Sequence, residues 1–214
     1  MFKLYARPGA GSMAIEAALA ECGVPHRVED LERGPDGRHP ASFHRINPLG
    51  QVPTLILPND SVMTESAAIL IYLADLYPGT GLAPPAASPL RPRYLRWLVY
   101  LATTVYMSDL RMYYPQRYTE DPAGAEAVKR VALSDMAREF EIFAAALGEG
   151  PYVLGETFSA VDIYAAMLAT QPRRARPGGL ERRRSRLLRQ ASQYQGAARP
   201  GGGEAPHRQG LGAE

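Results

Sequence analysis

The order of the structural elements in the first 78 residues constrains the fold more than any other feature of the sequence. Residues 2–6 form an apolar run that predicts a short buried strand. Residues 13–22 carry apolar side chains at helical spacing, with Ser12 in the N-cap position and Gly23 in the position that ends a helix. Residues 26–31 predict a second strand, so the chain opens with a strand–helix–strand unit.

The next elements complete a small α/β domain. Residues 34–44 are poorly patterned and predict a loop with a short helical turn. Residues 52–57 and 61–63 predict two strands joined by a turn, and residues 65–76 predict a helix. The resulting order, strand–helix–strand–loop–strand–strand–helix, is that of a thioredoxin-like domain, which we expect to span residues 1–78.

An all-α domain is predicted after a linker at residues 79–92, which is rich in proline, glycine and alanine. Residues 93–114 show a long helical pattern, and a second long helix is predicted from Pro122, with Val131, Met136 and Phe140 among its apolar positions. The Ser-x-x-Asp sequence at residues 159–162 is a capping box and predicts the start of a third helix. We therefore expect the helical domain to span residues 93–170.

The pattern stops after residue 170. Ten of the 24 basic residues but only three of the 22 acidic ones lie in residues 171–214, so the preceding part is acidic overall. This arginine-, glycine- and proline-rich tail is predicted to be irregular or disordered. A frameshift near residue 171 is one hypothesis for its origin, and a reading of the gene in the alternative frame would test it.

Composition excludes several classes of protein. The N-terminus lacks the charged and apolar regions of a signal peptide, and no apolar run reaches the roughly 20 residues that a membrane span needs. The single cysteine, Cys22, rules out an internal disulfide and suits the cytoplasm. Nucleic acid is not the expected partner, because the basic tail has no interleaved aromatic residue apart from Tyr194.

Residues 47–72 combine two features that suit a small peptide ligand. Val52 and Pro53 begin an extended segment, where a proline marks a sheet edge and an exposed backbone can pair with a peptide. Glu65 and Ser66 lie at a helix N-terminus, where free N–H groups and the helix dipole favour a carboxylate. Ordinary helix capping and an ordinary strand start are the alternative interpretations.

This combination resembles the glutathione-binding half of the cytosolic glutathione S-transferase superfamily, in its bacterial form. The resemblance implies that Pro53 is cis and that the Val52 backbone pairs with the cysteinyl part of glutathione. It also implies that Ser66 and the adjacent N–H groups hold the γ-glutamyl carboxylate, while Glu65 binds the ammonium group. The expected co-substrate is therefore glutathione.

Two further residues are candidate contacts to glutathione. Gln51 precedes the Val52–Pro53 pair, and His39 lies roughly where some family members place a basic residue for the glycyl carboxylate. A solvated loop histidine is the alternative interpretation of His39. No metal site is expected, because the four histidines show no ligand spacing, and no dinucleotide or phosphate-loop motif is present.

The residue that activates the thiol is less clear. Residues 4–12 resemble the opening of bacterial transferases that carry Pro-Gly-Ala-Cys-Ser, but Gly11 replaces the cysteine here. The cysteine-dependent mechanism of that subgroup is therefore not expected. Ser12 is the first candidate hydroxyl donor, with simple helix capping as the alternative, and Tyr5 is the second.

The first helix of the C-terminal domain carries candidate residues for the second substrate. Tyr106 and Tyr113 could line an apolar site for a small hydrophobic electrophile, although aromatic residues at this spacing also form helix cores. Cys22 lies on an apolar helix face and is interpreted as a packing residue.

Two functions remain open at this point. The first is a glutathione transferase that activates the thiol for attack on an electrophile, with conjugation, peroxidase and isomerase chemistry as possible reactions. The second is a non-catalytic glutathione-binding or protein-interaction member of the same fold. Resemblance to the superfamily further implies a homodimer.

Overall fold

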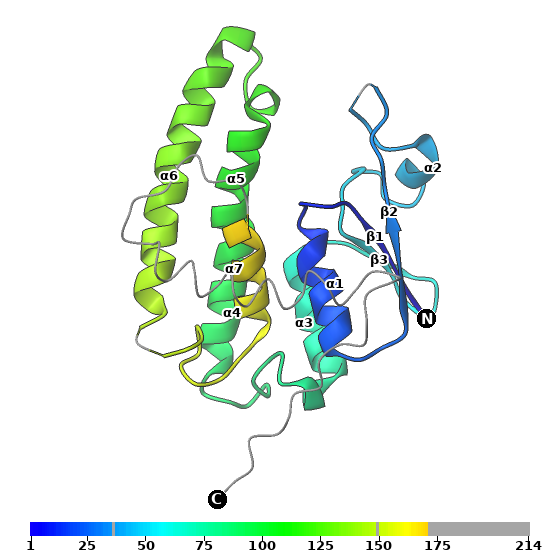
Figure 1. Ribbon diagram of the computed structural model, residues 1–214, viewed down its shortest axis with the longest axis vertical. Helices are drawn as coiled ribbons and strands as arrows, with labels where there is room; N and C mark the ends of the chain where they lie inside the picture. Colours follow the sequence, from blue (N-terminus) through cyan, green and yellow to red (C-terminus); the bar gives the residue numbers. More distant parts are fainter. Residues whose placement is uncertain (36, 149, 171–214) are drawn as a thin grey trace, which may run out of the picture.

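The computed structural model describes residues 1–35, 37–148 and 150–170 (Figure 1). The predicted irregular tail and the frameshift hypothesis concern residues 171–214 and therefore lie outside the described residues.

A four-stranded sheet forms the N-terminal domain. Its strands are β1 (Phe2–Ala6), β2 (His26–Asp30), β3 (Thr54–Ile56) and β4 (Val62–Met63), in the order β2-β1-β3-β4. β1 pairs parallel with β2 and antiparallel with β3, and β3 pairs antiparallel with β4. The parallel β1–β2 pair requires a crossover connection, and α1 (Ser12–Glu21) provides it.

Helices cover the two faces of this sheet unequally. α1 and α3 (Ser66–Leu76) pack on one face, and fully buried Leu4, Ile15 and Leu70 lie in the core between them. On the other face, Phe43 of the short helix α2 (Ala41–His44) closes a small cluster that includes Tyr5. The predicted α/β thioredoxin-like fold is confirmed.

The C-terminal domain is helical, as predicted, but its first helix is not continuous. α4 (Arg91–Tyr100) passes into a π-helical segment, η2 (Leu101–Val105), and continues as α5 (Tyr106–Tyr113). A π turn widens the helix and changes the direction in which the following residues point. Tyr106 is the first residue of α5 and directly follows this segment.

The remaining helices complete the domain. Two short 3-10 turns, η3 (Pro115–Arg117) and η4 (Pro122–Gly124), lead into α6 (Ala125–Ala146), and α7 (Ala160–Thr170) follows. α7 contacts α1, α3 and α4, so it lies where the two domains meet (Figure 1). Within the described ranges, no helix combines the length and apolar character that a membrane crossing requires.

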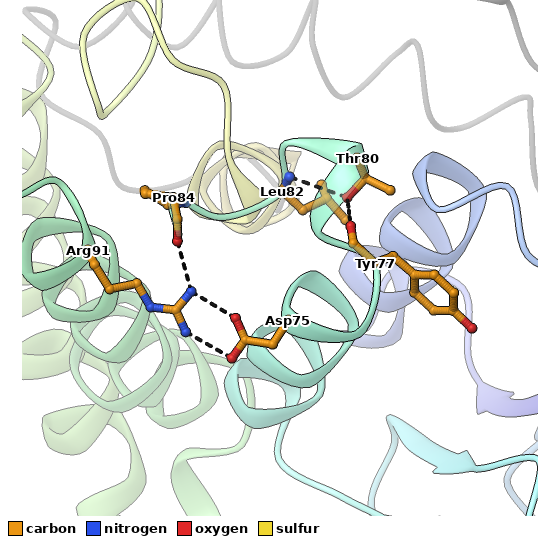
Figure 2. A network of polar contacts seen from close by, with 6 residues as sticks. All are labelled: Asp75, Tyr77, Thr80, Leu82, Pro84 and Arg91. Atoms are coloured by element: carbon orange, nitrogen blue, oxygen red, sulfur yellow. Dashed lines mark hydrogen bonds and ion pairs between the residues drawn. The ribbon is translucent and has the colours of Figure 1, made fainter. Parts of the chain in front are cut away.

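The segment predicted as a linker is held in place by polar contacts (Figure 2). The Arg91 guanidinium donates two hydrogen bonds to the Asp75 carboxylate, at 2.8 and 2.9 Å, and a third to the Pro84 carbonyl at 3.1 Å. The Leu82 side chain is fully buried, and the Ala160 N–H donates to the Leu82 carbonyl at 2.7 Å. Leu82 therefore anchors the connection between the domains to the packed core.

The predicted capping box at the start of α7 is present. The Asp162 carboxylate accepts hydrogen bonds from the Ser159 N–H at 2.9 Å, the Ser159 hydroxyl at 3.1 Å and the Val153 N–H at 2.8 Å. Burial raises the pKa of Asp162 to about 6, although these hydrogen bonds pull it in the opposite direction. Asp162 therefore fixes both the helix start and the preceding loop.

Two local expectations are wrong. Ser12 is the first residue of α1 and not its N-cap, a position that Gly11 occupies. Val131, expected on the inner face of α6, is 57% exposed, whereas Met136 and Phe140 are buried. Cys22 is half-buried at the end of α1, and burial raises the pKa of its thiol to about 11, which agrees with a packing role.

Candidate functional site

A cavity of about 580 Å³ lies between the two domains. Its N-terminal wall consists of the loops that follow β1 and β2 and the loop that precedes β3. Its C-terminal wall consists of α5 and the turn after it. Of the residues predicted from the sequence, those that line the cavity are His39, Gln51, Val52, Tyr106 and Tyr113.

One part of the N-terminal wall is a backbone edge at Val52. The Val52–Pro53 peptide bond is cis, as the family resemblance implied. Buried Asn47 holds the loop beside it, donating through Nδ2 to the Gln51 carbonyl at 2.9 Å and to the Thr54 hydroxyl at 3.0 Å. Val52 is thereby presented at the cavity edge with its backbone fixed.

The polar residues at the start of α3, Glu65 and Ser66, lie apart from the lining of this cavity. Glu65 is exposed and has φ +64°, a left-handed conformation that is uncommon for a residue other than glycine. The Ser66 hydroxyl lies 2.7 Å from the hydroxyl of Tyr164, a fully buried residue of α7. Neither Glu65 nor Ser66 is among the residues that line the 580 Å³ cavity.

The Ser12 hydroxyl makes its hydrogen bonds within the loop between β1 and α1. Its hydroxyl accepts a hydrogen bond from the Arg7 N–H at 3.1 Å and donates to the Arg7 carbonyl at 3.2 Å. The residue is 1% exposed and does not line the cavity. The structure therefore places Ser12 as the residue that closes the loop between β1 and α1.

Tyr5 also lies away from the cavity. Its hydroxyl accepts a hydrogen bond from the Lys3 ammonium at 2.7 Å, and its ring packs against Phe43 with the centroids 5.3 Å apart. It belongs to the small cluster on the face of the sheet that α2 covers.

The Tyr106 hydroxyl lies beside Gly11, the position where the family pattern has a cysteine. The Gly11 N–H donates to the Tyr106 hydroxyl at 3.1 Å. A Cβ atom at Gly11 would lie only 2.7 Å from that hydroxyl oxygen, closer than real Cβ contacts allow. The hydroxyl group therefore occupies the space that a side chain at position 11 would enter. Burial raises the pKa of Tyr106, so its hydroxyl stays protonated near neutral pH.

Three arginines that sequence reasoning missed surround Tyr114 of the C-terminal wall. The Tyr114 ring lies near two guanidinium groups, at 5.3 Å from Arg33 and 4.1 Å from Arg117, measured to the ring centroid. Arg7 donates to the Tyr114 hydroxyl at 3.3 Å. These three arginines are far apart in the sequence and match no motif, so no local signal could have placed them together.

His39 lies in the same environment. Its ring is 7% exposed and lines the cavity, with Nδ1 3.3 Å from the Glu32 carbonyl oxygen. Burial lowers its pKa, and the positive charges of Arg33 and Arg7 act in the same direction. His39 is therefore a largely neutral donor or acceptor near neutral pH.

Over residues 1–35, 37–148 and 150–170, no group of three or more His, Cys, Asp or Glu side chains could hold a metal ion.

A thioredoxin-like domain, a helical domain and a cavity between them define the architecture of a glutathione-transferase-like protein. Residues 12–76 match the family model of the glutathione S-transferase N-terminal domain, and residues 105–187 match that of the C-terminal domain. The chain belongs to the glutathione S-transferase family.

Two relatives from Escherichia coli agree with this assignment. The GST-like protein YncG of strain K12 is 33% identical over 79% of this chain and 82% of its own length. Glutathione S-transferase GstA of O157:H7 is 30% identical over 76% of this chain and 78% of its own length.

Solved structures show the same fold. A glutathione transferase homologue from Sulfitobacter, which contains bound glutathione, has a TM-score of 0.81 and 25% identity, covering 90% of this chain and 92% of its own. A sphingomonad glutathione S-transferase complexed with glutathione has a TM-score of 0.69 and 27% identity, covering 92% of this chain and 94% of its own.

Proposed function

We propose that this protein is a glutathione transferase that binds glutathione along the N-terminal wall and an electrophile against the C-terminal wall. The observation that carries the proposal is that Val52, beside the cis peptide bond, and Tyr106 line one cavity between the domains. The relative named as a transferase and the two structures with bound glutathione support it.

Glutathione binding is assigned to backbone and to the start of α3. The Val52 backbone pairs with the cysteinyl part of glutathione, and Gln51 and His39 lie beside it at the cavity edge. Glu65 binds the ammonium group and Ser66 the γ-glutamyl carboxylate. When Tyr164 donates to the Ser66 hydroxyl, the Ser66 proton remains available for that carboxylate.

Thiol activation is assigned to Tyr106. Its hydroxyl oxygen accepts the Gly11 N–H, so its own proton remains free to donate to a thiolate in the cavity. Ser12 has no such freedom, because its hydroxyl already donates and accepts within the loop. The local geometry therefore favours Tyr106 over Ser12 and Tyr5 as the donor.

The size of the effect follows from the charge of the acceptor. A hydrogen bond to a charged group contributes about 1.5–3 kcal/mol, which corresponds to a thiol pKa lowered by about one to two units. The thiol proton passes to solvent, and the sulfur then bonds to the electrophilic carbon. The leaving group departs with the electron pair of the bond that breaks.

The test combines binding and turnover in the full chain. Calorimetry with glutathione should show saturable binding, and a chlorodinitrobenzene should be conjugated faster than by glutathione alone. Tyr106→Phe should lower the rate about tenfold to a hundredfold while glutathione still binds. Tyr152→Phe, a half-buried tyrosine outside the cavity, is the matched control and should leave the rate unchanged.

Two outcomes would contradict the proposal in different ways. Glutathione binding without turnover of any electrophile would favour the non-catalytic alternative. Unchanged turnover in Tyr106→Phe would remove Tyr106 from the mechanism and leave the transferase activity in place.

A further inference from the structure

We propose that the part of the cavity around Tyr114, where the two walls meet, binds electrophiles that carry an acid group, held by Arg7, Arg33 and Arg117. This inference rests on the proposed transferase function and adds the class of its second substrate. The substrate would have an aromatic or unsaturated body, with an electrophilic carbon near Tyr106 and a carboxylate near Tyr114.

The arginines converge from three different parts of the chain. Arg7 follows β1, Arg33 follows β2, and Arg117 ends η3. Arg33 and Arg117 lie within cation–π distance of the Tyr114 ring, and Arg7 reaches its hydroxyl. Three guanidinium groups therefore lie around Tyr114 at the cavity wall.

Part of this donor capacity is unused within the described residues. The Nε atoms of Arg7 and Arg33 are both buried there without a hydrogen-bond partner. A buried donor of a charged group that lacks a partner is costly, and a carboxylate oxygen is its strongest acceptor. Both residues line the cavity, so a ligand in the cavity lies beside their side chains.

The charge of the cavity departs from that of its surroundings. The described lining residues include four arginines, the fourth being Arg38, but only one carboxylate, that of Asp109. By contrast, acidic residues outnumber basic ones over residues 1–170 as a whole. The positive potential is therefore a local property, which an anionic ligand would neutralise.

Glutathione alone does not account for this charge. Its γ-glutamyl carboxylate is assigned to Ser66 at the start of α3, which leaves only the glycyl carboxylate for the cavity. His39 and Arg38 follow β2 and line the cavity from the N-terminal side. Arg117 lies on the C-terminal wall with Tyr113 and Tyr114, where the second substrate is expected.

The test compares two electrophiles that differ by one acid group. A neutral chlorodinitrobenzene and its ring-carboxylated analogue, a chlorodinitrobenzoate, react with glutathione, and each enzymatic kcat/KM is normalised to its uncatalysed rate. The wild type should prefer the benzoate about tenfold or more, and high salt should reduce this preference. Arg117→Gln should lower kcat/KM for the benzoate about tenfold and change that for the neutral compound less than about twofold.

A matched control separates charge in the cavity from charge in general. Arg130 is an exposed arginine of α6 that does not line the cavity, so Arg130→Gln should leave kcat/KM unchanged for both electrophiles. Equal normalised rates for both electrophiles in the wild type would overturn the inference. An equal loss for both in Arg117→Gln would do the same, because it would show a structural role.

A binding experiment decides the inference even if no turnover occurs. The conjugates of glutathione with the two electrophiles are titrated into wild type and Arg117→Gln by calorimetry. Tighter binding of the carboxylated conjugate, lost in Arg117→Gln, would support the inference although the proposed transferase activity had failed. Equal affinity of the wild type for both conjugates would overturn it.

Discussion

The two walls of the cavity are built on different principles. The N-terminal wall includes a backbone edge at the cis Val52–Pro53 bond, which Asn47 holds in place, beside the side chains of Arg7, Arg33 and His39. The C-terminal wall presents side chains, above all Tyr106 and Tyr114, whose positions depend on how α5 packs against distant loops. A backbone edge can recognise a constant tripeptide, whereas a side-chain wall can vary with the substrate.

The largest expected effect concerns α7, because this helix supports both walls. Its Tyr164 lies 2.7 Å from the Ser66 hydroxyl and packs edge-on against Tyr106 with the centroids 6.3 Å apart. Asp162→Ala should lower the free energy of unfolding by about 3 kcal/mol, because a helix cap is lost and buried N–H groups lose their acceptor. Urea denaturation measures this, and a loss below about 0.5 kcal/mol would show that the box does not anchor α7.

The Asp162 effect should also depend on pH. The folded-state pKa of about 6 lies above the value of about 3.9 for an unfolded aspartate. The folded state therefore binds the proton more tightly, and the stability from this group is lost as the pH rises through 6. The difference in unfolding free energy between wild type and Asp162→Ala should be about 1 kcal/mol larger at about pH 5 than at about pH 7. The opposite trend would show that the hydrogen bonds outweigh burial.

The backbone edge at Val52 should depend on Asn47. Asn47→Ala removes the two Nδ2 hydrogen bonds to the loop and the acceptor of the Leu49 N–H. We expect a loss of about 2 kcal/mol in stability and weaker glutathione binding, measured by denaturation and calorimetry. Asn59→Ala removes similar contacts in an exposed turn and should cost less than about 1 kcal/mol. Unchanged glutathione affinity in Asn47→Ala would show that this loop does not position the ligand.

The fit between Gly11 and Tyr106 can be measured by a double-mutant cycle. Gly11→Ala places a Cβ 2.7 Å from the Tyr106 hydroxyl oxygen, so it should lower stability in the wild type by about 1 kcal/mol. In Tyr106→Phe the oxygen is gone, and the same substitution should cost clearly less. Additive effects would mean that the two residues do not share this space.

The smallest expected effect is at Tyr164. Tyr164→Phe removes one hydrogen bond to Ser66, so glutathione affinity should fall about threefold to tenfold, which corresponds to about 0.5–1.5 kcal/mol. Calorimetry measures this, with Tyr152→Phe as the control. No change in affinity would show that Ser66 acts without support from α7.

The same contrast explains what could be predicted from the sequence. The Val52–Pro53 pair and the Glu65–Ser66 pair at the start of α3 are recognisable from short stretches of sequence, and the order of the elements indicates the fold. Both could therefore be predicted before the structure. For Ser12, the sequence could not separate a thiol donor from a loop-closing group, because only its hydrogen-bond partners distinguish the two. The grouping of Arg7 and Arg117 around Tyr114 depends on tertiary packing and has no periodic signal.

The position of Tyr106 is a further example of this limit. The sequence shows that position 11 carries glycine instead of the expected cysteine. It does not show that the Tyr106 hydroxyl, from the other domain, occupies the space of the missing side chain. The π-helical segment directly before Tyr106 also has no recognisable signature in residues 93–114.

The central claim is that Tyr106 stabilises the glutathione thiolate, and the pKa of the bound thiol tests it most directly. Thiolate absorbance in the ultraviolet is followed against pH for wild type, Tyr106→Phe and Ser12→Ala, each saturated with glutathione. We predict a bound thiol pKa well below the free value of about 8.5 in the wild type. Tyr106→Phe should raise it by about one to two units. The same thiol pKa in wild type and Tyr106→Phe, with a raised value in Ser12→Ala, would contradict the claim and assign activation to Ser12.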